Sequence, residues 1–140
     1  GMIERAYSKI EPHLNDFMGG VFEEICKQWL WRKNRKGALP IEFTDLGRWW
    51  GNNPHKREEA ELDILAADGK TAALFAECKW KNENIDVTVL DTLIERSKLF
   101  SYPKICFYIF AKNGFTKSCI EKAKDMGNVT LVCFEDMINI

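Results

Sequence analysis

The segment that most restricts the fold of this 140-residue chain is KICFYIFA, at residues 104–111, in which every residue after the first is apolar. Successive side chains of a β-strand point to opposite faces of the sheet. A strand that is apolar at nearly every position must therefore be covered on both faces. The segment predicts a central strand in a sheet that has helices on both sides.

The other expected elements follow from hydrophobic spacing, helix caps and turn residues. In chain order we expect a helix over 3–10 that ends near Pro12, a second helix that begins at Asn15 or Asp16, strands over 41–50, 61–65 and 71–80, a helix over 85–101, the strand 104–111, a helix over 115–126, a strand over 129–134 and a closing helix over 135–140. Antiparallel strands followed by a helical crossover to a buried strand predict an α/β (α+β) architecture, with a mixed central sheet flanked by helices.

Three local features carry further predictions. Residues 51–54 (GNNP) are expected to form a polar loop, and Asp68–Gly69 a hairpin turn. Gly19 and Gly20 lower the helix propensity of the second helix, so we expect another segment to approach closely there.

The composition indicates one globular domain over residues 1–140, with 46% hydrophobic residues to build a core. Gly1 is interpreted as a tag remnant, and the chain as an excised part of a longer protein. No apolar run approaches the ~20 residues of a membrane span, and no signal peptide opens the chain. The five cysteines form no CxxC pair, which favours buried free thiols in a reducing cytoplasm.

Charged residues interrupt two of the expected strands. The first of these strands contains ELD at residues 61–63. Residues two apart in a strand share a face, so Glu61 and Asp63 are expected to point one way and Leu62 and Ile64 the other. A charge within an apolar strand is costly to bury unpaired, so these carboxylates require an explanation.

The second of these strands contains ECK at residues 77–79. Glu77 and Lys79 share a face, and one hairpin separates them from the ELD segment. One interpretation is a solvated face with surface ion pairs, which contribute little to stability. The other is the rim of a site. The site-rim interpretation is favoured because the face that carries Glu77 and Lys79 begins with the apolar residues Ala73 and Phe75 and becomes charged only at this pair.

Converging carboxylates suit a divalent metal ion. They raise each other's pKa unless a cation neutralises them, and Mg²⁺ or Mn²⁺ takes carboxylate and water oxygens as ligands. Such an ion can generate hydroxide and stabilise charge on a phosphodiester, while Lys79 holds the nucleophilic water or the oxyanion. Glu23 lies beside the apolar stripe of the second helix, where it can add a carboxylate.

A further group combines cations with aromatic rings ahead of the ELD segment: Arg48, Trp49, Trp50, Lys56 and Arg57. It can grip a phosphate backbone or stack on unpaired bases. The alternative is that one tryptophan lies in the core and the other at an interface, with Arg48 packed on either. The basic run 32–36 can contact DNA or simply complement a helix dipole.

These residues resemble the signature of the PD-(D/E)xK, restriction-endonuclease-like superfamily, which has a helix glutamate, then an aspartate, then Glu-x-Lys on consecutive strands. Here it consists of FE at residues 22–23, ELD at 61–63 and AECKW at 76–80. The stretches GGVFEEICKQWLWR, FTDLGRWWG, ELDIL, FAECKW and NGFT also resemble an uncharacterised domain at the C-terminus of prokaryotic, mainly archaeal, P-loop ATPases. The resemblance covers almost the whole chain.

The resemblance implies a restriction-endonuclease-like αβββαβ core, to which the first helix and the last strand and helix are additions. It implies that Asp63 and Glu77 ligate Mg²⁺ or Mn²⁺, that Lys79 serves the nucleophile or the transition state, and that Glu23 supports the metal or its waters. Leu62 replaces a proline that often precedes the aspartate, a change that the superfamily tolerates. The implied partners are DNA, an upstream ATPase domain of the same polypeptide, since no Walker motif is present here, and a second copy in a homodimer.

These features predict a Mg²⁺-dependent nuclease that hydrolyses DNA phosphodiesters. One alternative is a non-catalytic module of a larger ATPase that keeps the nuclease fold to bind DNA or protein. Another is a protein-interaction domain, in which Glu23, Asp63 and Glu77 need not lie near each other.

The net charge of −1 excludes a histone-like polycation but not a phosphodiester substrate. Residues 27–57 carry eight basic and two acidic side chains, whereas residues 58–91 carry three basic and nine acidic ones. A basic segment therefore precedes the acidic segment that holds the candidate metal ligands.

Overall fold

A five-stranded mixed sheet forms the centre of the computed structural model, which describes residues 2–53, 56 and 58–138. The strands are adjacent in chain order: β1 (Asp45–Asn53), β2 (Glu58–Ala67), β3 (Ala72–Lys79), β4 (Lys104–Ala111) and β5 (Val129–Cys133). The first three are antiparallel, and β3, β4 and β5 are parallel. The predicted mixed sheet is confirmed.

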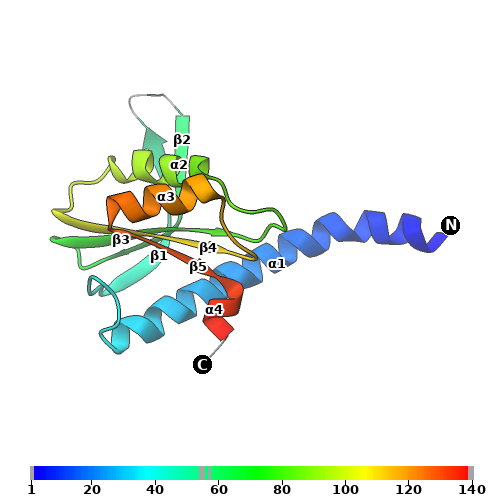
Figure 1. Ribbon diagram of the computed structural model, residues 1–140, viewed down its shortest axis with the longest axis horizontal. Helices are drawn as coiled ribbons and strands as arrows, with labels where there is room; N and C mark the ends of the chain where they lie inside the picture. The colour runs from blue at the N-terminus through cyan, green and yellow to red at the C-terminus, as the bar shows by residue number, and fades with distance from the viewer. Residues whose placement is uncertain (1, 54–55, 57, 139–140) are drawn as a thin grey trace.

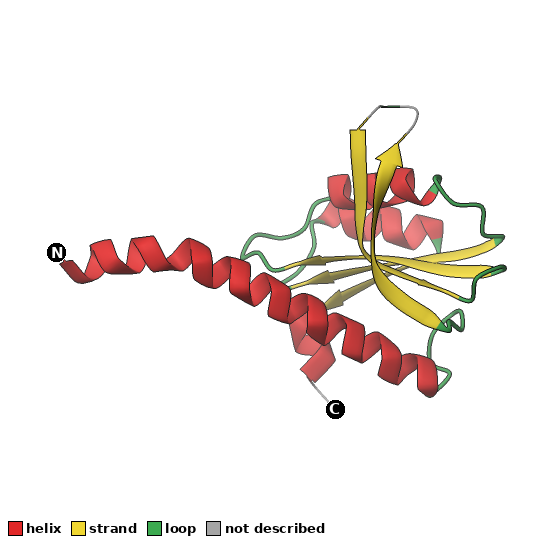
Figure 2. Ribbon diagram, turned by 180° about the vertical axis from the view of Figure 1, so that it is seen from behind, coloured by secondary structure: helices red, strands yellow, loops and turns green. Residues whose placement is uncertain are grey.

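Helices cover both faces of this sheet (Figure 1). They are α1 (Met2–Arg35), α2 (Val87–Ser97), α3 (Lys117–Met126) and α4 (Phe134–Ile138). Helices α1 and α4 lie on one face and α2 and α3 on the other, as both ribbon views show (Figure 2). The order from α1 to β4 is the expected αβββαβ core, which α3, β5 and α4 extend.

Strand β4 joins two hydrophobic clusters, one on each face of the sheet. Cys106, Tyr108 and Phe110 belong to the cluster under α1, whereas Phe107 and Ile109 belong to the cluster under α2 and α3. All five side chains are buried. The prediction that this apolar run is a central strand is confirmed.

The predicted hairpin turn between β2 and β3 is also confirmed. Gly69 adopts the left-handed conformation with φ of 94°, which costs glycine little. Asp68 Oδ1 accepts hydrogen bonds from the backbone N–H groups of Lys70, Thr71 and Ala72. These bonds lower the pKa of Asp68 well below its usual range. The turn fixes the register of the two strands that carry the ELD and ECK segments.

Helix α1 corrects two predictions about the N-terminal segment. It is continuous from Met2 to Arg35, so the chain does not break near Pro12 into two helices. A proline removes one backbone hydrogen-bond donor, and the helix continues past it without that bond. This half of α1 projects away from the other described helices and strands (Figures 1 and 2). The expected close approach at Gly19 and Gly20 is also wrong, because a Cβ at either would meet nothing within 4 Å.

Strand β1 begins four residues later than predicted and continues through most of the expected polar loop. Gly51, Asn52 and Asn53 pair with β2, so the sheet provides hydrogen-bond partners for their backbone groups. Pro54 lies outside the described residues. In the described part of the chain, no helix is both long and apolar enough to cross a lipid bilayer.

The segment between α1 and β1 is held by a side-chain amide. Asn34 Nδ2 donates to the Phe43 carbonyl at 2.9 Å, and Asn34 Oδ1 accepts from the Phe43 N–H at 3.1 Å. Phe43 is 4% exposed and packs edge-on against Trp31. The amide therefore provides the pairing that this buried residue does not receive from a strand.

We expect Asn34→Ala to lower the free energy of unfolding by about 1–2 kcal/mol, because both backbone groups of Phe43 lose their partner. Urea denaturation followed by tryptophan fluorescence measures the change. Asn15→Ala, at an exposed position of α1, is the matched control and should leave the midpoint unchanged. Equal midpoints for the two variants would show that the Asn34 bonds contribute nothing.

Candidate active site

Strands β2 and β3 separate where the two charged segments face each other. Their last paired residues are Ile64 and Ala76. We call the point where the two strands separate the β2–β3 fork. Asp63 and Glu77 are the next residues on the two strands, so both lie at this fork. Beyond it, β1 and β2 rise away from the other strands as a hairpin (Figure 2). At the fork, β3 is paired with β4 but no longer with β2, so the side chains between β2 and β3 lie open to one another.

A β-bulge in β2 lies at the same point. Gly47 pairs with Leu65 but Trp49 pairs with Leu62, so β2 has one more residue than β1 in this interval. The bulge turns Leu62 into the cluster under α2, whereas Ile64 lies in the cluster under α1. The prediction that Leu62 and Ile64 share a face is therefore wrong, because it assumed a regular strand.

Asp63 bridges the fork. Its Oδ2 accepts a hydrogen bond from the backbone N–H of Cys78 at 2.9 Å. That N–H lies beyond the last residues at which β3 pairs with β2, and the carboxylate takes the place of a partner on β2. Asp63 is thereby fixed beside Glu77, the residue before Cys78.

Glu77 is the most unusual carboxylate among the described residues, because it is 5% exposed and its Oε1 has no hydrogen-bond partner. The nearest cation recorded for that oxygen is Arg96 Nη1, at 3.7 Å. Burial, together with the hydrogen bond and the charge of Asp63, raises the pKa of Glu77 to about 9, whereas Lys79 and Arg96 act in the opposite direction. Without a bound cation, this environment favours the protonated form of Glu77.

Lys79 lines a pocket of about 200 Å³ together with Glu77. The other wall is α2, which contributes Thr88, Val89, Thr92 and Arg96. The pocket thus contains a buried acid, a lysine and an arginine on the face of the sheet that α2 covers. Arg96 was not predicted, since it is remote in sequence from the ELD segment that it contacts and only the fold brings it there.

Glu23 lies on α1, which covers the opposite face of the sheet. Its carboxylate pairs with Lys27 at 3.5 Å and with Arg48 at 3.8 Å. Arg48 also pairs with Glu61 at 3.4 Å. Burial lowers the pKa of Arg48, but the carboxylates of Glu23, Glu61 and Asp63 outweigh it and the net shift is upward. Arg48 therefore neutralises the acidic residues around Asp63, a role that was not predicted.

The family comparison covers the part of the chain that carries the β2–β3 fork. Residues 1–91 match the model of DUF234, described as archaea bacterial proteins of unknown function. The chain belongs to this family. The segment that matches DUF234 contains all four predicted catalytic residues, whereas Arg96 lies beyond it.

Two known proteins are similar to this DUF234 chain. The uncharacterized protein MJECL04 of Methanocaldococcus jannaschii is 38% identical over 93 residues, which cover 65% of this chain and 20% of that protein. The chain thus spans about a fifth of the length of this curated relative. The structure of the DNA modification-dependent restriction endonuclease AspBHI aligns with 96% of this chain and 32% of its own, at 15% identity and a TM-score of 0.44.

The fork can accept a divalent cation. Mg²⁺ binds through one or two carboxylates and keeps several water ligands. Asp63 and Glu77 supply two adjacent carboxylates, and Glu77 Oε1 is buried without a hydrogen bond. Within the described ranges, no three His, Cys, Asp or Glu side chains are grouped so as to hold a metal. The fit is therefore to an ion with two protein ligands. The carboxylate of Glu23, the predicted third ligand, pairs with Lys27 and Arg48.

The predicted nucleic-acid-binding residues have different environments. Trp50 is 71% exposed, whereas Trp49 packs edge-on against Phe100 with ring centroids 4.9 Å apart. Lys56 lies 4.0 Å from Glu95. Arg57 lies outside the described residues. The exposed Trp50 keeps the predicted ability to stack on a base, and Trp49 does not.

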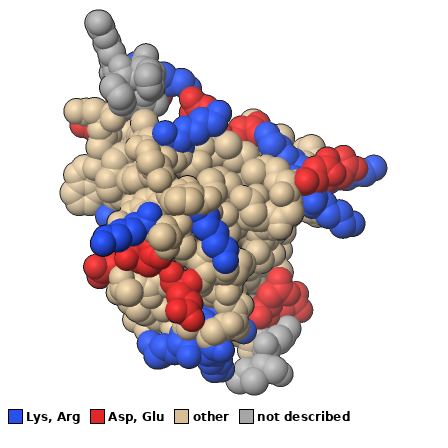
Figure 3. Space-filling model, turned by 90° about the vertical axis from the view of Figure 1, so that its left-hand side faces the viewer, with Lys and Arg blue, Asp and Glu red and all other residues tan. Residues whose placement is uncertain are grey.

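Charges of both signs are mixed on the face shown in Figure 3. Lys and Arg side chains lie in several separate places there, with acidic side chains between them. The uneven charge of the sequence therefore produces no single continuous basic surface on this face.

Proposed function

We propose that this domain is a Mg²⁺-dependent nuclease that hydrolyses DNA phosphodiesters at the β2–β3 fork. The observation that supports this most is the buried, unbonded Oε1 of Glu77 beside Asp63 and Lys79. A buried carboxyl oxygen without a hydrogen bond is costly, and coordination of a cation removes that cost. No other described side-chain N or O atom is buried without a hydrogen bond.

The residues of the fork have separate roles in this proposal. Asp63 and Glu77 would hold the ion, which supplies a hydroxide nucleophile and charge stabilisation when bound. Lys79 orients the attacking water or stabilises the charge that develops on the phosphate. Glu23 acts through Arg48, which it holds near Asp63, and is not a direct ligand.

The test combines metal binding with cleavage. Wild-type protein is titrated with Mn²⁺ by calorimetry and then incubated with plasmid, single-stranded DNA and RNA. We expect Lys79→Ala to lower the cleavage rate at least about 100-fold with unchanged Mn²⁺ affinity, because the lysine acts on charge in the transition state. Asp63→Asn should weaken Mn²⁺ binding itself.

Lys81→Ala is the matched control, since Lys81 is an exposed lysine just beyond the end of β3. It should cleave like the wild type. Cleavage that survives Lys79→Ala unchanged would refute the assignment of this site.

A second candidate is a non-catalytic module of a larger ATPase, which keeps the fold to bind DNA or protein. Its support is the projecting half of α1, where Met2, Ile3, Leu14 and Phe17 are exposed. Exposed apolar patches of this kind mark protein contacts. Failure of Mn²⁺ to bind, with no effect of Asp63→Asn, would favour this function.

The association with an ATPase domain of the same polypeptide is part of both proposals. Its support is the sequence resemblance and the greater length of the Methanocaldococcus relative, of which this chain covers 20%. The proposed location is the cytoplasm, which agrees with five free cysteines.

A further inference from the structure

Arg96 joins the end of α2 to the fork. Its Nη1 donates a 2.6 Å hydrogen bond to the backbone carbonyl of Glu61, two residues before Asp63 on β2. The same nitrogen lies 3.7 Å from Glu77 Oε1, beyond hydrogen-bond distance. The side chain is 29% exposed, so part of the guanidinium remains accessible. Arg96 is thus fixed at one side and open at the other.

Two pockets meet at this side chain. One is the pocket of about 200 Å³ that contains Glu77 and Lys79, and the other, of about 380 Å³, lies between α2 and β2. Thr92 and Arg96 line both. Thr92 donates its hydroxyl proton to the Thr88 carbonyl at 3.0 Å, so Arg96 is the shared residue that has donors to offer a ligand.

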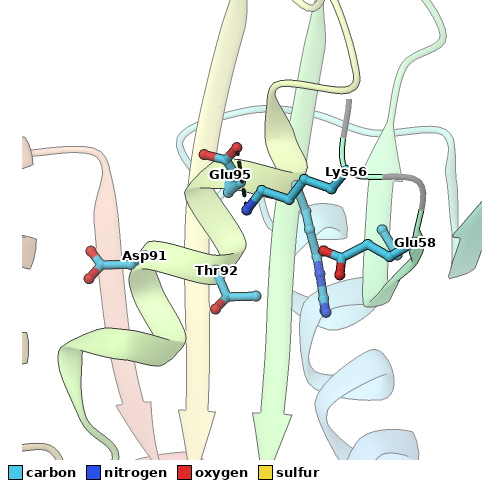
Figure 4. A pocket seen from close by; sticks show the side chains of 7 residues that line it. Lys56, Glu58, Asp91, Thr92 and Glu95 are labelled. Atoms are coloured by element: carbon cyan, nitrogen blue, oxygen red, sulfur yellow. Dashed lines mark ion pairs between the residues drawn. The ribbon is translucent and has the colours of Figure 1, made fainter. Parts of the chain in front are cut away.

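The second pocket has an acidic lining. Figure 4 shows Glu58, Asp91 and Glu95 around it, with Lys56 directed at Glu95. Asp91 in turn pairs with Lys122 from α3. The second pocket thus has three acidic side chains against Lys56 and Arg96, whereas the first has Glu77 alone against Lys79 and Arg96. A phosphate is therefore favoured on the side of Arg96 that faces Lys79.

The two cations that line the first pocket would favour such an anion once a metal is bound. The two carboxylates of Asp63 and Glu77 balance the two charges of a divalent ion. Arg96 and Lys79 then remain as two cations next to a neutralised centre, a state that is unfavourable unless an anion lies among them. A phosphodiester has one negative charge, and an arginine can bind it through two parallel hydrogen bonds.

We propose that Arg96 is a substrate-binding residue that holds a backbone phosphate of the nucleic acid against Glu77 and Lys79. This inference rests on the proposed nuclease function and deepens it, because it identifies a phosphate subsite. The bond to the Glu61 carbonyl keeps the guanidinium in place before substrate arrives. The subsite therefore requires no rearrangement of α2.

The test measures metal and DNA binding separately. Ca²⁺ takes oxygen ligands like Mg²⁺, and its binding is followed by calorimetry. Binding of a short fluorescein-labelled DNA duplex in buffer that contains Ca²⁺ is followed by fluorescence anisotropy at several salt concentrations. A gel shows whether the duplex stays intact during the measurement. Arg96→Gln and Arg96→Lys are compared with the wild type. Lys98→Gln is the matched control, an exposed lysine just after α2 that pairs with Glu95.

We expect Arg96→Gln to keep Ca²⁺ binding and to weaken DNA binding about tenfold. The slope of log affinity against log salt should become shallower by about 1, since one phosphate contact is lost. Arg96→Lys should keep this slope, because it keeps the charge, and Lys98→Gln should match the wild type. A purely structural role of Arg96 would not change the slope.

Each contrary outcome has a defined meaning. Normal Ca²⁺ binding together with unchanged DNA affinity and salt slope in Arg96→Gln would overturn the role of Arg96 and leave the metal site standing. If Arg96→Gln does not fold, Arg96→Lys decides the question, provided that it folds. Wild-type DNA affinity and salt slope in Arg96→Lys would support the charge role of Arg96. A shallower salt slope in Arg96→Lys would overturn that role. A wild type that binds neither Ca²⁺ nor Mn²⁺ would overturn the nuclease proposal and this inference with it.

Discussion

Raising the pH from about 5.5 to about 8 is expected to lower the free energy of unfolding of the metal-free protein by about 3 kcal/mol, and Glu77→Gln should remove most of this dependence. The pKa of Glu77 is raised from 4.5 to about 9 by burial and by Asp63. Between these values the folded protein keeps a proton that the unfolded chain releases. The stability is therefore complete below the unfolded pKa and is lost as the pH rises towards the folded pKa.

Urea denaturation at half-unit pH intervals, in a buffer free of divalent ions, measures this slope. The range stops at about pH 8 because two thiols would add to the slope at higher pH. A hydrogen bond with Cys26 and burial raise the pKa of the Cys78 thiol, and burial raises the pKa of the Cys106 thiol. Glu121→Gln, on the exposed side of α3, is the matched control and should keep the wild-type slope. A wild-type curve that is flat over this range would show that Glu77 is ionised in the folded protein.

Predictions based on burial patterns proved the most reliable for the fold. The apolar run 104–111 could form only a strand covered on both sides, and it lies in both hydrophobic clusters. The turn at Asp68–Gly69 was equally well determined, because its carboxylate and its glycine each satisfy a local requirement of the backbone. The predicted helix break at Pro12 is wrong because a proline removes only one backbone hydrogen bond, and the helix continues on both sides of it from Met2 to Arg35.

The candidate site was predictable only in part. Spacing indicates that Glu77 and Lys79 share a face, and they line one pocket. It could not reveal the bulge that turns Leu62 to the other cluster, since a bulge depends on how two strands pair. The spacing also could not show that Arg48 and Arg96 contact Glu61, which lies 13 and 35 residues away from them in the sequence. Cations that neutralise a site from other elements become visible only when the fold is known.

The contacts of Glu23 were also not predictable from the sequence. The resemblance implies that Glu23, on the second expected helix, supports the metal, and in the structure Glu23 lies on α1, which packs on the sheet. In the structure, its carboxylate contacts Lys27 and Arg48. The order of motif residues along the chain therefore predicts which elements meet, and the charges between them decide which side chains touch.

The affinity for Mn²⁺ is expected to rise about tenfold per pH unit between pH 6 and 8, which is the second large effect of the fork. A cation must displace the proton that Asp63 and Glu77 share in the metal-free state, because ligands bind metals in their deprotonated form. The pKa of Glu77, at about 9, lies above this whole range, so one proton leaves for each ion bound. The slope of one decade per pH unit follows from that stoichiometry.

Calorimetry in two buffers of different ionisation enthalpy gives the number of protons directly, as the difference in binding heat divided by the difference in buffer heat. Glu77→Gln should bind Mn²⁺ more weakly and without this pH dependence, since it has no proton to release. Glu121→Gln should release one proton like the wild type. Tight, pH-independent binding by the wild type would mean that the ion occupies some other position, because an ion at Glu77 must compete with its proton.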